Sequence, residues 1–298
     1  MDVVVFGAGS LGSLVGGLLA AEHDVTLVGR PAHVEAVRDR GLRITGQIGR
    51  TVHPNAVTDL DTAEADLAVV TVKAYDTEAA TAALARCKLG AVLSLQNGMG
   101  NEETLAAALD SPVLAGTTNY GAELTEPGVV ECTGIGRVVL GPRPGREGDV
   151  ERAESVGATF ASANIETLVE ADMAPRLWEK LAVNAGINPV TALARVENGA
   201  LGTGPAADLA ERAAVEVADA ARDHGVSLTE AAARDALASV VETTAENRSS
   251  MYQDVAAGRR TEIDAISGYV VDHAQGAVPI NETLAALLRT WESARGLR

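Results

Sequence analysis

The sequence predicts an α/β protein: an N-terminal Rossmann-type doubly wound sheet followed by an all-helical C-terminal domain. One observation behind this prediction is a short apolar run, residues 2–6, that leads directly into a glycine-rich motif and an apolar helix pattern. Another is a series of strand-like apolar runs that alternate with helical patterns and stop near residue 170. Helical patterns dominate afterwards, so we expect two domains, residues 1–170 and 171–298.

Composition excludes several classes of protein. With 298 residues, the chain is long enough for two domains with separate cores. A net charge of −17 argues against a nucleic acid or an anionic membrane as a partner. There is no run of about 18 apolar residues, and the N-terminus passes directly into a strand pattern, so neither a membrane span nor a cleavable signal is expected. Cys87 and Cys132 are too few for a disulfide framework, which fits a cytoplasmic protein.

The glycine-rich motif at residues 7–12 matches G-x-G-x-x-G between a strand and a helix. Gly7 permits a tight turn, Gly9 lets the backbone approach a pyrophosphate, and Gly12 lets the helix pack closely on the strand. The N–H groups at the start of the helix would then bind the anion. The motif predicts a dinucleotide cofactor held by Gly7, Ala8, Gly9, Ser10, Leu11 and Gly12.

The end of the second strand indicates which dinucleotide is bound. An NAD-binding fold usually places an acidic residue here, whereas an arginine accommodates the 2′-phosphate of NADP. This strand, residues 24–28, is followed by Gly29 and Arg30, and no acidic residue occurs until Glu35. The pattern favours NADPH; the alternative is that Arg30 is a solvated turn residue and that cofactor preference is weak.

Two later strands also end in polar residues. Ligands of a doubly wound sheet bind beyond the carboxyl ends of its strands. Lys73 follows the strand at residues 67–72, and Asn97 follows the strand at residues 91–95. Asn97 could bond the nicotinamide ribose or a substrate, or it could only cap the turn.

Smaller elements are expected between and after these strands. Two short strands are expected on either side of a glycine-rich turn, at residues 42–44 and 51–57. The pattern of apolar and other residues at positions 129–132 and 137–140 predicts the two strands of a hairpin.

The second domain is expected to begin with a helix that ends or kinks at Pro189. Three polar residues, Lys180, Asn184 and Asn188, interrupt its apolar run at four-residue steps. Because four residues advance a helix by about 400°, the three form one stripe about 80° wide. Burying this stripe without partners would cost several kcal/mol, so it faces either water or a ligand.

Lysine usage favours the ligand. Only three of the 24 basic residues are lysines, namely Lys73, Lys88 and Lys180. Unlike arginine, a lysine can give up a proton and can be tuned by burial. We therefore expect Lys180 to have a chemical role.

The rest of the second domain reads as helices. Long alanine-rich helices are expected at about residues 206–223 and 229–244, and further helices at about 262–274 and 281–294. Residues 246–254 form a polar stretch that is unsuited to the interior of a packed helix.

Several motifs together give the chain a resemblance to the ketopantoate reductase family (2-dehydropantoate 2-reductases), over nearly all of its length. They are GAGSLG at the start, VKAY at residues 72–75, QNGMG at 96–100, LWEKLAVNAGINPVTAL at 177–193, ENRSSMYQD at 246–254 and TEID at 261–264. The first motif is common to many dehydrogenases. The helix with the polar stripe, combined with NRSSM and TEID, is much more specific.

The resemblance implies roles for individual residues. NADPH would be held by the residues from Gly7 to Gly12 and by Arg30, Lys73, Asn97 and Ala122. Lys180 would be the general acid, and Glu262 would lie between the substrate hydroxyl and the cofactor. The keto acid would be held by Asn97, Lys180, Asn184, Asn188, Asn198, Asn247 and Ser250. No metal ion is implied.

The chemistry of these residues agrees with the implied roles. Hydride transfer to a ketone carbon builds negative charge on the oxygen, which an ammonium within about 3 Å can stabilise and protonate. Glu262, being anionic, would keep Lys180 protonated if the two were close. We expect the active site in a cleft between the two domains.

The implied reaction is NADPH-dependent reduction of 2-dehydropantoate (ketopantoate) to (R)-pantoate in pantothenate and coenzyme A biosynthesis. Two alternatives stay open: a reductase of another branched 2-keto acid, and a non-catalytic NADPH-binding regulator on the same fold. A 3-hydroxyacyl or sugar-phosphate dehydrogenase would need other catalytic residues. A homodimer is possible.

Overall fold

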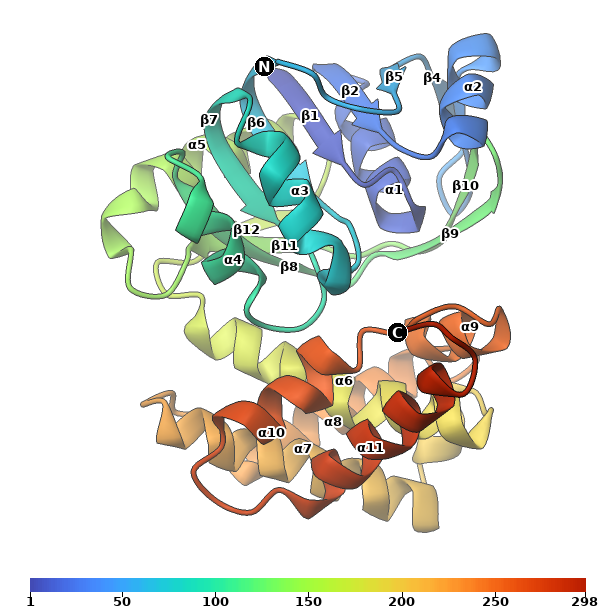
Figure 1. The fold of residues 1–298 in the computed structure, drawn as a ribbon, viewed down its shortest axis with the longest axis vertical. Helices are drawn as coiled ribbons and strands as arrows, with labels where there is room; N and C mark the ends of the chain where they lie inside the picture. Colours follow the sequence, from blue (N-terminus) through green and yellow to red (C-terminus); the bar gives the residue numbers. More distant parts are fainter. The chain divides into compact units, whose positions relative to one another are not determined.

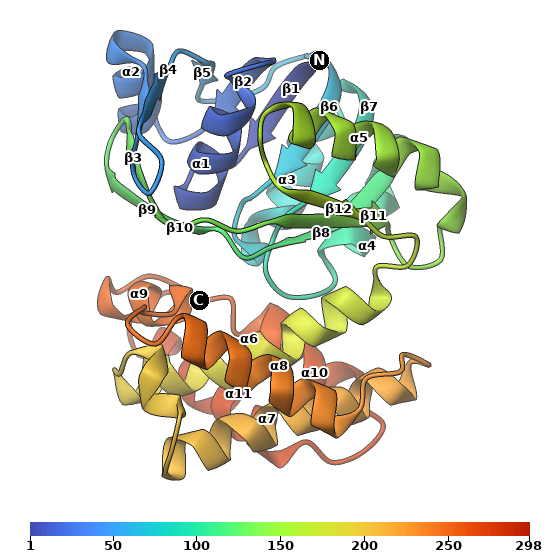
Figure 2. The ribbon, with the colours of Figure 1, turned by 180° about the vertical axis from the view of Figure 1, so that it is seen from behind.

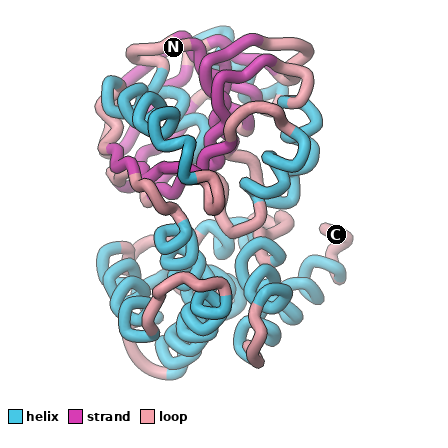
Figure 3. The backbone as a smooth tube through the Cα atoms, turned by 90° about the vertical axis from the view of Figure 1, so that its left-hand side faces the viewer, coloured by secondary structure: helices cyan, strands magenta, loops and turns pink.

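The computed structural model describes residues 1–298, apart from the side chain of Glu147. The chain forms two compact units. Unit 1 consists of Met1–Gln96 and Asn101–Met173, and unit 2 of Asn97–Gly100 and Ala174–Arg298. All strands belong to unit 1, and unit 2 is helical (Figure 3). The predicted fold class is therefore confirmed.

An eight-stranded sheet forms the centre of unit 1, in the order β12-β11-β8-β7-β6-β1-β2-β5. Its strands are β1 (Asp2–Phe6), β2 (Asp24–Val28), β5 (Asn55–Val57), β6 (Glu64–Val70), β7 (Lys88–Ser94), β8 (Val113–Thr118), β11 (Val138–Pro142) and β12 (Thr167–Val169). All neighbours are parallel except β8 and β11. Because β1 is flanked by β2 and β6, the strand order reverses beside it, and such a switch point is where ligands bind.

Helices cover both faces of this sheet (Figures 1 and 2). On one face lie α1 (Ser10–Leu19) and α5 (Val150–Ser162), and on the other α3 (Thr77–Leu84) and α4 (Asn101–Ala108). The helix α2 (Pro31–Arg40) packs beside β5. Successive strand residues alternate between the two cores: Val3 and Val5 belong to the first, and Val4 to the second. Burial on both sides explains why these strands are continuous apolar runs.

A second, four-stranded sheet covers α1, in the order β4-β3-β10-β9. Its strands are β3 (Leu42–Gly46), β4 (Arg50–Val52), β9 (Gly121–Glu126) and β10 (Val129–Gly134). The predicted hairpin of residues 129–132 and 137–140 is wrong. β10 pairs with β9 and β3, whereas β11 crosses to the large sheet and pairs with β8. In the large sheet Val138 and Leu140 are fully buried, and the burial of these apolar side chains stabilises the pairing with β8.

The predicted strand at residues 51–57 is also divided between the sheets. β4 pairs with β3 in the small sheet, and β5 pairs with β2 in the large one. Pro54 lies between them and cannot donate to a strand ladder, which explains the break.

Unit 1 contains one buried histidine that links several elements. His33, in α2, accepts a hydrogen bond at Nδ1 from the N–H of Gly128, 3.1 Å away in the turn between β9 and β10. Its Nε2 lies 3.1 Å from the hydroxyl of Ser13 in α1. Since Nδ1 accepts, the neutral ring carries its proton on Nε2 and donates to Ser13. Protonating Nδ1 would break the bond to Gly128.

His33 should make the stability of the protein depend on pH. Burial lowers the pKa of His33, whereas the unfolded chain binds a proton near pH 6.5. The stabilising contribution is complete above that pH and is lost as the pH falls towards the folded pKa, by at most about 2 kcal/mol at pH 5. Urea unfolding at pH 8 and at pH 5 measures this dependence. Between the two pH values, the unfolding free energy of His33→Asn should fall by less than that of the wild type. The exposed His53 is the control, and equal losses in His33→Asn and His53→Asn would contradict the role.

Unit 2 is built from helices with an alanine-rich core. They are α6 (Ala174–Ala194), α7 (Pro205–Asp223), α8 (Glu230–Thr243), α9 (Ser250–Ala256), α10 (Tyr269–His273) and α11 (Pro279–Ser293), with a π-helical turn η4 (Asp264–Gly268) and a 3₁₀ turn η3 (Asn198–Leu201). Small residues allow close approach: a Cβ at Gly186 in α6 would lie 2.9 Å from the carbonyl oxygen of Ala210 in α7. Among the described residues, no helix is both long and apolar enough to span a bilayer.

The sequence predicts that Pro189 ends or kinks the first helix of unit 2; α6 continues through Pro189 to Ala194, so it does not end there. Pro189 has no N–H to donate to the preceding turn. The next turn is supported by Thr191, whose hydroxyl lies 2.8 Å from the carbonyl oxygen of Ile187. The hydroxyl of Thr191 also lies 2.7 Å from that of Ser249, just before α9.

The polar stretch at residues 246–254 also departs from the prediction, because part of it forms α9. Ser249 caps this helix, its hydroxyl accepting a 3.0 Å hydrogen bond from the N–H of Tyr252. Met251 and Val255 are buried against α6. A cap and two apolar residues at helical spacing are sufficient for a short helix that a partner helix supports.

Candidate functional site

In unit 1 the ends of three strands meet at one edge of the large sheet. Phe6 of β1 pairs with Val28 of β2 and with Val70 of β6. The residues that follow these strands therefore lie side by side. This is the edge at which the glycine-rich turn joins α1.

Each glycine of the motif has a distinct environment. Gly7 has a φ of 110°, and a Cβ there would lie 2.7 Å from the backbone of Val72. A Cβ at Gly12 would lie 2.3 Å from the carbonyl oxygen of Gly7, so only glycine fits. At Gly9 the nearest atom would be 3.9 Å away, which leaves open space against the backbone. Such space beside a helix N-terminus fits a pyrophosphate.

The backbone hydrogen bonds of the turn leave the start of α1 available. The N–H of Ala8 bonds the carbonyl oxygen of Val28 at 2.8 Å, and that of Gly9 bonds the oxygen of Gly7 at 2.6 Å. The N–H groups at the start of an α-helix have no partner within the helix. In α1 these belong to Ser10, Leu11 and Gly12, all within the predicted motif.

Two hydroxyls hold this turn in place. Thr71 donates to the carbonyl oxygen of Gly7 at 2.9 Å, a role that the sequence reasoning missed. The signal was a threonine directly after the buried strand β6. The hydroxyl of Ser10 accepts a 3.0 Å hydrogen bond from the N–H of Leu124 in β9, which ties α1 to the small sheet.

Arg30 follows β2 at the same edge. It precedes α2, and its side chain is exposed. Within the described part of the chain, its guanidinium has no hydrogen bond or ion pair. Gly29 packs against Ala8, since a Cβ there would lie 3.0 Å from that of Ala8. Arg30 is thus an available cation next to the glycine-rich turn.

The other predicted cofactor residues of unit 1 are less exposed. Lys73 is half-buried at the start of the 3₁₀ turn η1 (Ala74–Asp76). Gln96, which the sequence reasoning did not assign, donates from Nε2 to the carbonyl oxygen of Val72 at 3.1 Å and supports this turn. Ala122 lies within β9, opposite Cys132, and packs against the core around α1.

Unit 2 brings Asn97 and Glu262 together. Nδ2 of Asn97 donates to Oε2 of Glu262 at 3.3 Å, although the residues are 165 positions apart. The N–H of Met99 bonds the carbonyl oxygen of Ala265 at 3.0 Å, so residues 97–100 are attached to the turn that carries Glu262. Glu262 is only 5% exposed.

The polar stripe on α6 is only partly accessible to water. Lys180 and Asn184 are half-buried, and Asn188 is buried. Nδ2 of Asn184 is completely buried and has no hydrogen-bond partner among the described residues. A buried donor left unpaired costs about 1–3 kcal/mol, which a ligand oxygen would recover.

The remaining predicted substrate residues lie near the start of α9. Asn198 donates its N–H to the carbonyl oxygen of Asn247 at 2.9 Å, and its Nδ2 to the hydroxyl of Thr244 at 2.9 Å. Its Oδ1 is buried and has no partner in the described chain. Asn247 is exposed, and Ser250 is the first residue of α9. The orphaned oxygen and the orphaned donor on α6 can serve a ligand with hydroxyl and carbonyl groups.

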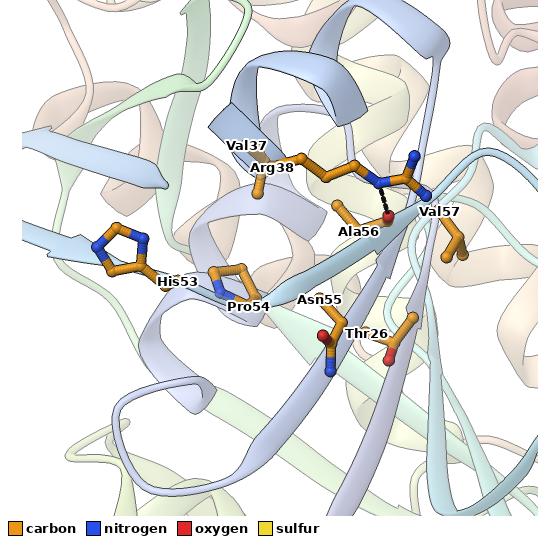
Figure 4. Close-up of a pocket in the computed structure, with 8 residues that line it drawn as sticks. All are labelled: Thr26, Val37, Arg38, His53, Pro54, Asn55, Ala56 and Val57. Atoms are coloured by element: carbon orange, nitrogen blue, oxygen red, sulfur yellow. Dashed lines mark hydrogen bonds between the residues drawn. The ribbon is translucent and has the colours of Figure 1, made fainter. Parts of the chain in front are cut away.

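Two open depressions are lined by other residues. One, on the edge strand β5, is lined by Thr26, Val37, Arg38, His53, Pro54, Asn55, Ala56 and Val57, and Nε of Arg38 closes one side by donating to the carbonyl oxygen of Ala56 at 2.7 Å (Figure 4). The other includes Arg195, Arg248 and Tyr252. Neither contains a predicted site residue. No cluster of metal-ligating side chains occurs among the described residues.

The chain matches two family models in succession. Residues 3–145 match the model "Ketopantoate reductase PanE/ApbA", and residues 172–292 match "Ketopantoate reductase PanE/ApbA C terminal". Together they span both units.

Proteins named 2-dehydropantoate 2-reductase are similar over almost the whole chain. The one from Halobacterium salinarum is 46% identical, over 97% of this chain and 98% of its own length. The one from Pyrococcus horikoshii is 39% identical, over 99% of both chains.

Solved structures have the same fold. A PanE/ApbA family ketopantoate reductase from Ralstonia eutropha has a TM-score of 0.89 and 32% identity, covering 99% of this chain and 100% of its own. D-mandelate dehydrogenase with NADH and anilino(oxo)acetate has a TM-score of 0.91 with full coverage of both chains, but at 24% identity it supports the fold alone. From the two family models and the near-complete coverage of the relatives, we conclude that this chain belongs to the ketopantoate reductase family.

Proposed function

We propose that this protein reduces ketopantoate to (R)-pantoate with NADPH, with Lys180 as the general acid, as a step of pantothenate and coenzyme A biosynthesis. Besides family membership, one observation carries the proposal: the buried, unpaired Nδ2 of Asn184, one helical turn from Lys180. An orphaned buried donor next to an ammonium suits a substrate oxygen that gains charge during reaction. In this proposal residues 1–170 are the NADP-binding domain, and residues 171–298 are the substrate domain.

The residues of unit 1 fit a phosphorylated dinucleotide. Open space at Gly9 and the N–H groups at the start of α1 would receive the pyrophosphate, and Arg30 would pair with the 2′-phosphate. Lys73, Asn97 and Ala122 would complete the cofactor site. When bound, NADPH supplies the hydride for the C2 ketone.

In unit 2, each residue would have a separate task. Lys180 would stabilise the developing negative charge on the ketone oxygen and protonate it. The substrate would be oriented without added charge by Asn184, Asn188, Asn198, Asn247 and Ser250. Glu262 would accept from the substrate hydroxyl and orient Asn97, with which it already forms a hydrogen bond.

The reaction can be tested by following absorbance at 340 nm with ketopantoate and either NADPH or NADH. The comparison substrates are a second branched 2-keto acid and an aromatic one, because the fold alone also occurs in D-mandelate dehydrogenase. We expect efficient turnover with ketopantoate and NADPH only. Faster turnover of another keto acid would contradict ketopantoate as the substrate. Tight NADPH binding without turnover of any keto acid would instead indicate a non-catalytic NADPH-binding regulator.

Arg30 should determine the preference for NADPH. Losing one or two hydrogen bonds to a charged phosphate should raise the Kd for NADPH by about 10- to 100-fold in Arg30→Ala. The Kd for NADH should change less than about twofold, because NADH has no 2′-phosphate. Fluorescence titration of both cofactors measures this, with Arg50→Ala, at an exposed position of β4, as the charge-matched control. Parallel weakening of both cofactors would contradict the assignment.

A further inference from the structure

Near the end of α11, unit 2 contains a carboxylate, Glu292, that is completely buried. Taking a carboxylate out of water is costly unless hydrogen bonds compensate for the loss. Oε1 of Glu292 accepts from the N–H of Thr261 at 2.7 Å and from its hydroxyl at 2.6 Å. Oε2 accepts from Nη1 of Arg298 at 3.0 Å. Glu292 therefore holds both the backbone and the side chain of the residue that precedes Glu262.

The other end of the same turn is attached to α11 as well. Oδ1 of Asp264 accepts from Nε of Arg289 at 2.8 Å, and Oδ2 accepts from Nη2 of Arg298 at 2.7 Å. Burial by itself raises the pKa of Asp264, but the hydrogen bonds and charges of Arg289 and Arg298 outweigh it and lower the pKa. Residues 261–264 are thus anchored on both sides of Glu262.

The backbone after Glu262 is restrained too. The N–H groups of Ala265 and Ile266 both bond the carbonyl oxygen of Glu262 at 3.2 Å. The N–H of Gly268 bonds the oxygen of Ile263, five residues back, at 2.8 Å, which makes this a π-helical turn. π-helical turns are rare and occur frequently at functional sites. With its backbone held in this way, the side chain of Glu262 reaches Asn97.

We propose that Glu292 is a positioning residue for the reaction: through Thr261, it determines where the Glu262 carboxylate and its partner Asn97 lie. This inference rests on the proposed reductase function. Residues 97–100 are bonded to the same turn, so a shift at Thr261 moves both groups. Glu292 itself touches neither substrate nor cofactor in this role.

The variants Glu292→Gln and Thr261→Val test the link. Glutamine keeps the size of the side chain but offers an amide donor towards Thr261 or Arg298, and valine removes the hydroxyl of Thr261. Because a displacement of about 1 Å can cost about 100-fold in rate, we expect kcat with ketopantoate to fall by at least about tenfold in each. Because Asn97 is one of several proposed contacts to NADPH, the Kd for NADPH, titrated without keto acid, should rise much less than kcat falls. Thr261→Ser restores the hydroxyl and should recover most of the rate.

The chain provides a matched control for a purely structural role. Glu216 in α7 binds the other end of α11, accepting from the N–H groups of Ile280 and Asn281, both at 2.9 Å. Glu216→Gln should lower the melting temperature and leave kcat unchanged at temperatures where it is folded. If Glu292→Gln behaves in the same way, the positioning role is overturned.

A mutant cycle identifies the residues through which Glu292 acts. In a background that carries both Glu262→Gln and Asn97→Ala, Glu292→Gln should lower kcat by less than about threefold further, because both groups that it positions have already been replaced. A full tenfold further loss would mean that Glu292 acts independently of Glu262 and Asn97 and would overturn the inference. If Glu292→Gln does not fold, Thr261→Val takes its place in the same cycle and provides the same test. An inactive wild type would remove the proposed function and this inference together, whereas an active wild type with unaffected variants would remove the inference alone.

Discussion

Replacing Lys180 with alanine is expected to lower kcat for ketopantoate by about 10³-fold, within the range for loss of a general acid and of charge stabilisation. The physical reason is that the ketone oxygen becomes an alkoxide during the reaction and has no other cation assigned to it in unit 2. The Kd for NADPH should stay within about twofold, because Lys180 lies on α6 in unit 2, whereas the proposed phosphate contacts lie in unit 1. Stopped-flow turnover at 340 nm and fluorescence titration of NADPH measure the two quantities separately.

Two further variants sharpen this result. Lys180→Arg keeps the positive charge but cannot release a proton at any working pH, so it should recover little activity. Lys88→Ala removes another of the three lysines, one that is exposed on β7, and should leave kcat unchanged. A selective loss of NADPH affinity in Lys180→Ala, with kcat preserved, would contradict the general-acid role.

Gly12→Ala is expected to impair both folding and cofactor binding. Its Cβ would lie 2.3 Å from the carbonyl oxygen of Gly7, so the turn must shift, and overpacking of this kind costs about 1–3 kcal/mol. A displaced turn loses its N–H contacts to the pyrophosphate. With two charge-assisted hydrogen bonds lost, the Kd for NADPH should rise by about 100-fold or more.

Gly9→Ala should separate these two effects. Its Cβ would have no neighbour closer than 3.9 Å, so the unfolding free energy should change by less than about 0.5 kcal/mol. The methyl group would nevertheless stand where the pyrophosphate is proposed to approach, and NADPH should bind at least about tenfold more weakly for one lost hydrogen bond to charge. Urea unfolding and fluorescence titration of both glycine variants test this. Unchanged NADPH binding by Gly9→Ala would place the pyrophosphate elsewhere.

Local patterns were sufficient for much of the fold. The strand, turn and helix around Gly7–Gly12 were read correctly because steric exclusion at Gly7 and Gly12 acts between residues near each other in sequence or at adjacent strand ends. The stripe on α6 followed from helical periodicity alone, and in the structure its residues are partly or fully buried. The apolar patterns likewise predicted that an α/β unit is followed by a helical one.

Tertiary structure decided the features that depend on partners distant in sequence. Whether residues 138–142 paired with β10 or β8 depended on which partner buried Val138 and Leu140, and periodicity does not contain that information. The helix through Pro189 and the short α9 depend on each other through Thr191 and Ser249, 58 residues apart.

The site divides in the same way. The sequence by itself indicated a dinucleotide site and a polar stripe that could face a ligand, because glycine sterics, helix termini and four-residue spacing are local properties. A keto acid as that ligand was implied only by the family resemblance. Only the tertiary structure joined Asn97 to Glu262 and placed Glu292 against Thr261, 31 residues away. Hydrogen bonds of this kind form where packing brings two segments together, and that packing depends on the whole core of unit 2 rather than on either segment.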